Sequence, residues 1–312
     1  MEIHNEPLLT TVFADHTDFH PEPGSLYIGF EGLEERSGHF LSLTNLEGET
    51  TFLKVVSEGD TEFRANVIGE NNVLSYRLRS RSDLDRIWTA NDCDSIYLDI
   101  TGLRHHVWIP LLRSALATTR KVKVVYVEPS DYRHSLTPTE SQIFDLSERI
   151  GGISPIPGFA SFRRSVDDFL FLPLLGFEGT RLAYLLEQVQ PIVDRIIPIV
   201  GVPGYLPEHP FNSLLGNRIA LQETEAWQHV RFADANCPFS LFYTLERIEQ
   251  ELRAEHSKIA LIGTKPHALG GVLFALKDQS RRELIYDHPI RKTERTTGVG
   301  RLLQYEVSEF MR

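Results

Sequence analysis

The chain has 312 residues, of which 41% are hydrophobic and 24% are charged, and its net charge is −11. This length and composition predict a folded protein of one large or two medium domains. The acidic balance argues against general binding to a nucleic-acid backbone, because that binding needs clustered lysine and arginine. No apolar run approaches the length of a membrane span, the N-terminus lacks a signal-peptide pattern, and Cys93 and Cys237 form no disulfide framework. We therefore expect a cytoplasmic protein that does not enter membranes.

In the first half of the chain, short apolar runs alternate with segments of helical spacing, which is typical of α/β proteins. The glycine- and asparagine-rich stretch 59–72 is expected to be an exposed hairpin or loop. Ser82 or Asp83 is expected to cap a short helix. The predicted strands are 26–28, 51–56, 73–78, 95–100 and 121–128, and the predicted helices are 34–43, 82–90 and 105–117.

The second half repeats this alternation after a segment that we interpret as a linker or crossover. That segment, 134–166, contains Pro138, Pro155, Pro157 and a pair of glycines. The predicted strands beyond it are 169–175, 195–200, 258–262, 283–286 and 302–310, and the predicted helices are 180–189, one within 237–254 and one that begins at 265–267.

An internal repeat relates the two halves. The sequence Gly-Phe-Glu-Gly occurs at 29–32 and again at 176–179, and two further segments match in the same order. The matching segments are 26–32 with 173–179, the turn at Gly102 with the turn at Gly263, and 124–129 with 283–289. The repeat predicts two Rossmann-like α/β domains with mostly parallel sheets, 1–150 and 151–312, arranged as an intrachain pseudo-dimer.

The segment 258–276 is the centre of the candidate site. Its apolar run predicts a buried strand, and Thr264 and Pro266 are typical of the start of a helix. A helix N-terminus at the carboxyl edge of a parallel sheet favours an anion, and Lys265 adds a positive charge. The alternative is a well-formed strand-to-helix turn with a solvated lysine.

Basic side chains open a helix in each half. Arg104, His105 and His106 open the first-half helix, and Lys265 and His267 open its counterpart. A cation at a helix N-terminus costs roughly 0.3–1 kcal/mol unless an anion is nearby, so the pattern predicts a shared anionic ligand. The alternative is that these side chains point into water. No metal is expected, because adjacent histidines on a helix diverge and no third ligand has a suitable spacing.

Acidic residues follow several of the predicted strands. Glu31 and Glu178 lie in the two Gly-Phe-Glu-Gly turns, where a glutamate can accept a ribose hydroxyl pair. They can equally form structural ion pairs with Arg36 and Arg181, respectively. Asp99 ends a strand at a position from which a carboxylate can coordinate Mg²⁺ or act as a base. Asp99, Glu128 and His267 are the candidate catalytic residues if the protein is an enzyme.

The Gly263-Thr264-Lys265 turn after a buried strand, followed by a helix of small residues, resembles the ligand loop of CARF domains. These are Rossmann-like sensors of cyclic oligonucleotides in prokaryotic defence, and SAVED domains look like two CARF units fused in one chain. The resemblance implies that the turn contacts a nucleotide or cyclic oligonucleotide, with Thr101 and Arg104 as a diverged second copy. It also implies that the effector is a separate partner protein.

The sequence therefore predicts a non-catalytic sensor or regulatory subunit, in the setting of antiviral defence, that binds a nucleotide-like anion and acts with a partner protein. Two alternatives remain open: a hydrolase or transferase acting on a nucleotide or phosphorylated substrate, and a structural interaction subunit of a multiprotein complex. No cofactor is expected. The residues expected at the ligand are Gly263, Thr264, Lys265, His267, Thr101, Arg104, His105, Glu178, Arg181 and Glu31.

Overall fold

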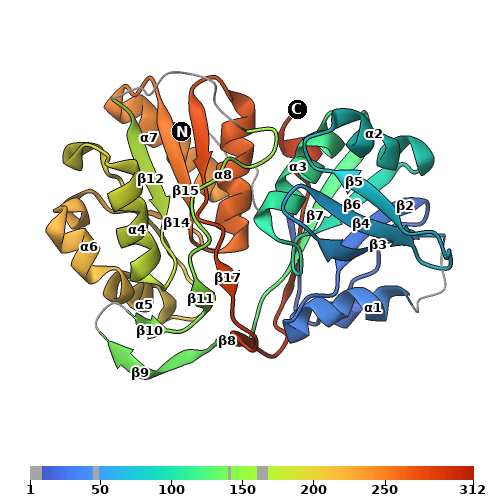
Figure 1. Ribbon diagram of the computed structural model, residues 1–312, viewed down its shortest axis with the longest axis horizontal. Coiled ribbons are helices and arrows are strands. Elements are labelled where there is room, and N and C mark those ends of the chain that lie inside the picture. The colour runs from blue at the N-terminus through green and yellow to red at the C-terminus, as the bar shows by residue number, and fades with distance from the viewer. Residues whose placement is uncertain (1–8, 45–48, 140–141, 160–167) are drawn as a thin grey trace. The chain divides into compact units, whose positions relative to one another are not determined.

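The computed structural model describes residues 9–44, 49–139, 142–159 and 168–312, and it divides the chain into two compact units (Figure 1). Unit 1 comprises Met1–Asp131 and Thr296–Arg312, and unit 2 comprises Tyr132–Arg295. This division returns the last segment of the chain to unit 1, whereas the sequence repeat favoured two contiguous halves. Residues 140–141 and 160–166 of the expected linker lie outside the described residues.

Unit 1 is built on an eight-stranded mixed sheet with the strand order β1-β19-β7-β6-β2-β3-β4-β5. The four central strands, from β7 to β3, are parallel, and antiparallel strands extend the sheet at both edges. The strands are β1 (Thr10–Phe13), β2 (Ser25–Phe30), β3 (Thr51–Glu58), β4 (Glu62–Val67), β5 (Leu74–Arg77), β6 (Ser95–Asp99), β7 (Lys121–Val127) and β19 (Leu302–Tyr305). Strands β2, β6 and β7 are buried on both faces, which explains their largely apolar runs.

Short 3₁₀ segments and α-helices connect these strands. They are η2 (His16–Asp18), η3 (Glu35–Gly38), α1 (His39–Thr44), α2 (Arg81–Ala90), α3 (His105–Leu116) and α9 (Val307–Phe310). The predicted helix 34–43 is therefore a 3₁₀ turn followed by a short helix. The predicted cap of α2 was wrong: Ser80 is the N-cap, and its hydroxyl accepts a hydrogen bond from the Asp83 amide.

The structure corrects two predictions for the unit 1 sheet. The segment 59–72 was expected to be an exposed hairpin or loop. It does contain β4, which forms a hairpin with β3, but buried Phe63 and Ala65 alternate with more exposed neighbours, as in a half-buried strand. The surrounding asparagines and glycines obscured this alternation. The expected final strand 302–310 ends at Tyr305, and the chain continues as α9.

Unit 2 is built on a five-stranded parallel sheet with the order β14-β13-β12-β15-β16. In sequence order this is 3-2-1-4-5, the order of doubly wound α/β sheets. The strands are β12 (Leu170–Leu174), β13 (Ile199–Gly201), β14 (Arg231–Ala233), β15 (Ser257–Leu261) and β16 (Arg282–Ile285). The connecting segments are α4 (Gly179–Val189), η4 (Val193–Arg195), α5 (His209–Gly216), α6 (Arg218–Glu223), η5 (Ala226–His229), α7 (Pro238–Leu252) and α8 (Lys265–Lys277).

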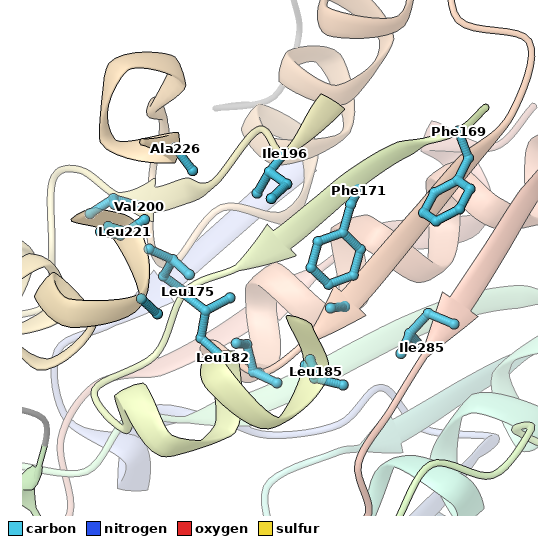
Figure 2. Close-up of a cluster of buried hydrophobic side chains, with 13 residues drawn as sticks. Phe169, Phe171, Leu175, Leu182, Leu185, Ile196, Val200, Leu221, Ala226 and Ile285 are labelled. Atoms are coloured by element: carbon cyan, nitrogen blue, oxygen red, sulfur yellow. The ribbon is translucent and has the colours of Figure 1, made fainter. Parts of the chain in front are cut away.

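Apolar side chains from both α4 and α6 pack on one face of this sheet (Figure 2). This core contains Phe169, Phe171, Leu175, Leu182, Leu185, Ile196, Val200, Ala220, Leu221, Ala226, Ala260, Ile262 and Ile285. Helix α8 packs on the alternate side chains of β15, since Gly271 lies against Ile259 and Leu261. Helices therefore cover both faces, which is why the strands of this sheet are apolar throughout.

Short strands outside the parallel sheet occupy much of the described part of the expected linker or crossover. Strand β9 (His134–Thr139) pairs antiparallel with β10 (Gln142–Phe144), and β11 (Ser147–Arg149) pairs with β17 (Ile290–Arg291). Two further short strands, β8 (Asp131–Tyr132) and β18 (Thr296–Thr297), lie at the unit boundaries. The predicted strand 195–200 was also too long, since its regular part begins only after Pro198.

The parallel strands of the two units follow one another in the same spatial order. In unit 1 this order is β3-β2-β6-β7, and in unit 2 it is β13-β12-β15-β16. The protein is thus a mixed α/β protein with parallel strands at the centre of each unit. No helix among the described residues is both long and apolar enough to cross a membrane.

Candidate functional site

The switch point of the unit 2 sheet lies between the carboxyl ends of β12 and β15, because the chain continues from β12 to one side and reaches β15 on the other. The loops after these two strands meet backbone to backbone. A Cβ on Gly263 would lie 2.9 Å from the Leu174 carbonyl oxygen, and one on Gly176 would overlap the Ile262 carbonyl oxygen. Glycine is therefore required in both loops for this close approach.

The same close approach occurs in unit 1 between the ends of β2 and β6. A Cβ on Gly102 would overlap the carbonyl oxygen of Phe30, and Gly32 lies against Gly102. The matched glycines at 102 and 263 thus perform the same steric task in the two units. This is a backbone role that needs no ligand.

Helix α8 begins at the end of β15 as the sequence predicted. Thr264 is its N-cap: the hydroxyl oxygen accepts a hydrogen bond from the His267 amide at 3.3 Å and the hydroxyl donates to the Ala235 carbonyl at 2.7 Å. Pro266 lies in the first turn, which contains no acidic residue. Lys265 is 5% exposed, so the alternative of a solvated lysine is wrong.

His267 is buried in the first turn of α8, with its Nε2 atom 3.0 Å from the Asp234 carbonyl oxygen. Burial lowers the pKa of His267 to about 4 from its ordinary value of 6.5, although hydrogen bonds to the Asp234 and Ala233 backbone act in the opposite direction. The imidazole is therefore neutral at pH 7. A neutral ring removes one of the unfavourable charges that the sequence predicted at this helix end.

The depressed pKa of His267 makes the folded state sensitive to mild acid. The unfolded chain takes up a proton near pH 6.5 and the folded protein only near pH 4, so stability is complete above pH 6.5 and is lost as the pH falls between these values. We expect the unfolding free energy to fall by about 2 kcal/mol between pH 7 and pH 5, and His267→Gln to abolish this part of the loss. Urea unfolding at both pH values measures it, with His256→Gln as the control. An equal pH dependence in wild type and His267→Gln would contradict the assignment.

The first-half counterpart, helix α3, receives an acidic side chain from its own unit. The Glu58 carboxylate, at the end of β3, accepts a hydrogen bond from the Arg104 amide at 2.6 Å and lies 3.7 Å from the Arg104 guanidinium. Its side chain is only 4% exposed. A carboxylate of the protein thus already binds the N-terminus of α3, at the place where the sequence predicted an external anion.

The remaining first-half candidates lie around the same helix. Thr101 is fully buried, and its hydroxyl oxygen accepts a hydrogen bond from the Val127 amide. The His105 ring lies 5.5 Å from the Trp108 ring. His106 approaches the Gly59 carbonyl oxygen at 3.1 Å. The His106 contact joins α3 to the loop after β3, and Thr101 joins the loop after β6 to β7.

The two Gly-Phe-Glu-Gly glutamates are used differently. The Glu31 carboxylate lies 3.1 Å from the Lys54 ammonium and is partly exposed. The Glu178 carboxylate is buried and accepts three hydrogen bonds, from the Leu146 amide, the Ser147 amide and the Ser147 hydroxyl. The same tetrapeptide therefore supplies a partly exposed ion pair through Glu31 in unit 1. In unit 2 it supplies a buried acceptor of three hydrogen bonds through Glu178.

The two arginines that were expected to pair with these glutamates take other carboxylates. Arg36 binds Glu34, with a shortest distance of 2.7 Å. Arg181 makes a bidentate ion pair with Asp287, at 2.7 and 2.6 Å. Burial of the Arg181 side chain lowers its pKa. The charge of Asp287 outweighs this effect, so the net pKa of Arg181 is raised.

The candidate catalytic carboxylates of unit 1 are engaged by protein groups. Asp99 is buried, accepts hydrogen bonds from the Thr101 amide and the Tyr27 hydroxyl, and lies 3.3 Å from His39 Nε2. Burial raises the pKa of Asp99, but the hydrogen bonds and the charge of His39 outweigh this, so the net pKa is lowered. Glu128 is buried and accepts two hydrogen bonds from Arg301, at 3.0 and 3.2 Å.

The sequence did not identify most of the partner residues of the candidate site. Asp287 is the second residue after the end of β16. The rule that selected Asp99 could have found it, because both residues lie at the carboxyl ends of strands. Glu58 was hidden because the predicted strand ended at Val56. His39 and Tyr27 carried no signal, because only the tertiary structure brings them to Asp99.

Two cavities of unit 2 are lined by residues other than those of the predicted site. In the described parts of the chain no three His, Cys, Asp or Glu side chains gather at a spacing that would hold a metal ion. A cavity of about 400 Å³ on unit 2 is lined by Glu246, Glu249, Gln250, Arg253, Ala254, Glu255, Arg281 and Arg282. Another, of about 360 Å³, is lined by Leu214, Arg218, Leu221, Gln222 and Trp227.

Comparisons with known proteins assign no family to the chain. No protein-family model matches it, and no curated protein sequence matches it significantly.

Proposed function

We propose that the protein is a non-catalytic sensor or regulatory subunit that binds a nucleotide-like anion at the N-terminus of α8 in unit 2. The observation that carries this proposal is the N-terminus of α8 itself. Its first turn contains Lys265 and no acidic residue, and the hydroxyl of Thr264 is its N-cap. A helix N-terminus with a lysine and no acid in its first turn favours an anion.

The position of α8 supports the same proposal. The helix follows β15 at the switch point of a sheet with the strand order 3-2-1-4-5, and ligands of such sheets bind outside the carboxyl ends of the strands. The Gly263-Thr264-Lys265 turn carries the resemblance to CARF and SAVED domains. On this proposal the two units are Rossmann-like repeats of a pseudo-dimer, the ligand is a nucleotide or cyclic oligonucleotide of antiphage defence, and the effector is a separate protein.

The surroundings of the candidate acids and bases favour binding over catalysis. Asp99, Glu128 and His267 are each buried and each hydrogen-bonded to other protein groups. A general base must reach the proton that it removes, either directly or through one water molecule. The hydrolase or transferase alternative therefore requires these residues to leave their present partners.

Lys265→Ala is expected to abolish the stabilisation of the protein by its nucleotide while leaving the fold intact. A ligand present at one hundred times its dissociation constant stabilises a folded protein by about 2.7 kcal/mol, and removal of the ammonium removes the charge that attracts the phosphate. Thermal unfolding with a panel of mononucleotides and cyclic oligonucleotides measures this. Lys277→Ala, at the opposite end of the same helix, is the matched control because Lys277 is exposed and pairs with Glu246.

The same panel separates the alternatives. Stabilisation that is equal in wild type and Lys265→Ala would place the ligand elsewhere. Turnover of a nucleotide in the presence of Mg²⁺ would favour the enzyme. The absence of any stabilisation of the wild type would overturn the proposal.

A structural interaction subunit is the second candidate, and exposed apolar side chains favour it. Phe211, Leu215, Trp227 and Phe232 are each between 46% and 73% exposed. They lie on α5, η5 and β14 of unit 2, and Trp227 lines the apolar cavity beside α6. Exposed apolar side chains that cluster on neighbouring elements often mark protein contacts.

A further inference from the structure

Residues 142–149, called the strap below, are fastened to the loop that follows β12. Glu178 in this loop is the first fastening point. Its Oε1 atom accepts hydrogen bonds from the Leu146 amide at 3.1 Å and the Ser147 amide at 2.9 Å, and its Oε2 atom accepts one from the Ser147 hydroxyl at 2.7 Å. All three donors belong to the strap.

An aromatic stack is the second fastening point. Phe144 of the strap is 1% exposed and stacks on Phe177, with ring centroids 4.5 Å apart and an interplanar angle of 23°. Phe177 directly precedes Glu178, so the strap contacts two successive residues of the same loop. Phe177 also contacts His209 of α5, with ring centroids 5.1 Å apart and an interplanar angle of 67°.

The segment after β16 is the third fastening point. Asp145 of the strap accepts hydrogen bonds from the Lys292 ammonium at 2.6 Å, and the Lys292 amide donates to the Leu146 carbonyl at 3.0 Å. Strand β11, which ends the strap, pairs with β17. These contacts do not involve Glu178, so the strap keeps an attachment when the carboxylate is removed.

The number of acceptor sites on Glu178 limits what else this carboxylate can bind. An ionised carboxylate offers about four lone-pair positions. The strap fills three of them, which leaves about one. A vicinal hydroxyl pair, such as that of a ribose, donates two hydrogen bonds and therefore needs one position that the strap now occupies.

We propose that the strap is an autoinhibitory latch, and that a ligand with a vicinal hydroxyl pair binds Glu178 only when the strap releases it. The ligand part of this inference rests on the proposed function, whereas the latch itself does not. Glu178 lies in the loop after β12, and Lys265 begins the helix after β15, so the two flank the switch point of one sheet. Glu178 would select the hydroxyl pair, and the N-terminus of α8 would hold the phosphate.

Hydrogen exchange of the Leu146 and Ser147 amides tests the latch without any ligand. Glu178→Ala removes both acceptor oxygens, so we expect exchange of the two amides to increase about tenfold or more. Glu178→Gln keeps one oxygen for the amides, and Ser147→Ala removes only the hydroxyl donor, so each should increase exchange less. Glu187→Ala is the matched control, because Glu187 lies at an exposed position of α4, the helix that follows Glu178. Unchanged exchange in both Glu178 variants would overturn the latch.

Adding ATP and its dideoxy analogue to the protein tests the competition. We expect ATP to increase exchange of the two strap amides and to bind Ser147→Ala more tightly than wild type. The dideoxy analogue, which lacks the hydroxyl pair, should leave the amides protected. If ATP stabilises wild type and Ser147→Ala equally and the amides stay protected, the inference fails and the proposed function stands. If ATP binds neither wild type nor Ser147→Ala, both the inference and the proposed function fail for this nucleotide.

Discussion

Arg181→Ala is expected to destabilise unit 2 by about 3–5 kcal/mol, because it leaves a buried carboxylate without its cation. Asp287 is fully buried and the Arg181 side chain is 12% exposed, so neither group regains full hydration when its partner is lost. The arginine also lies 3.4 Å from the Ile262 carbonyl oxygen. One side chain therefore joins α4 to the ends of both β15 and β16.

Urea unfolding followed by circular dichroism measures this loss. Arg195→Ala is the control, because the Arg195–Asp168 pair is more exposed, with side chains that are 32% and 65% accessible. Exposed pairs contribute about 0–1 kcal/mol. The double variant Arg181→Met with Asp287→Leu should recover much of the stability, since it leaves no buried charge. A loss in Arg181→Ala no larger than that of the control would show that the pair is not important for folding.

Gly102→Ala is expected to destabilise unit 1 by about 3 kcal/mol, at the upper end of the range for overpacked sites. The new methyl group would overlap the Phe30 carbonyl oxygen. Because that oxygen belongs to the end of a central strand, no side-chain rotation relieves the clash. The loops after β2 and β6 must separate instead.

Gly38→Ala is the matched control for this substitution. Gly38 lies in the same unit, and a Cβ there would meet no atom within 4 Å. Since alanine restricts the unfolded chain, we expect a change between about zero and a gain of 1 kcal/mol. Thermal unfolding of both variants provides the comparison. Equal stability of the two would show that the loops of unit 1 separate at little cost.

The sequence predicted the parallel strands and the start of α8 well, for a local reason. A strand that is covered on both faces needs a continuous apolar run, and β6, β7, β12 and β15 each have one. The N-cap of α8 was also predicted correctly, because a threonine followed by lysine and proline satisfies the first turn from nearby residues.

The edges of the sheets were predicted poorly, because their residues are specified by distant partners. Strand β4 exists through its pairing with β3, and β19 joins the unit 1 sheet although it is far from that sheet in the sequence. Both are antiparallel additions to a parallel centre. A pattern read along the chain contains no information on which strand will lie beside which.

The candidate site divides in the same way. The matched glycines at 102 and 263 could be found from the sequence, since each marks a turn between an apolar run and a helix. The partners of the matched glutamates could not be predicted. The glutamate of the same tetrapeptide pairs with Lys54 in unit 1 and accepts hydrogen bonds from the strap in unit 2. Identical local sequence gives an identical turn, but the partners come from elsewhere in the chain.

The sequence alone determined the α/β class, the parallel centre of each unit and the position of the helix N-terminus that carries Lys265. These features depend on interactions within a strand or within one turn of a helix. The tertiary structure alone decided which charges are already neutralised, because ion pairs form between residues far apart in sequence. It placed Glu58 at the start of α3 and Asp287 beside Arg181. The N-terminus of α3 therefore binds a carboxylate that its own local sequence does not reveal.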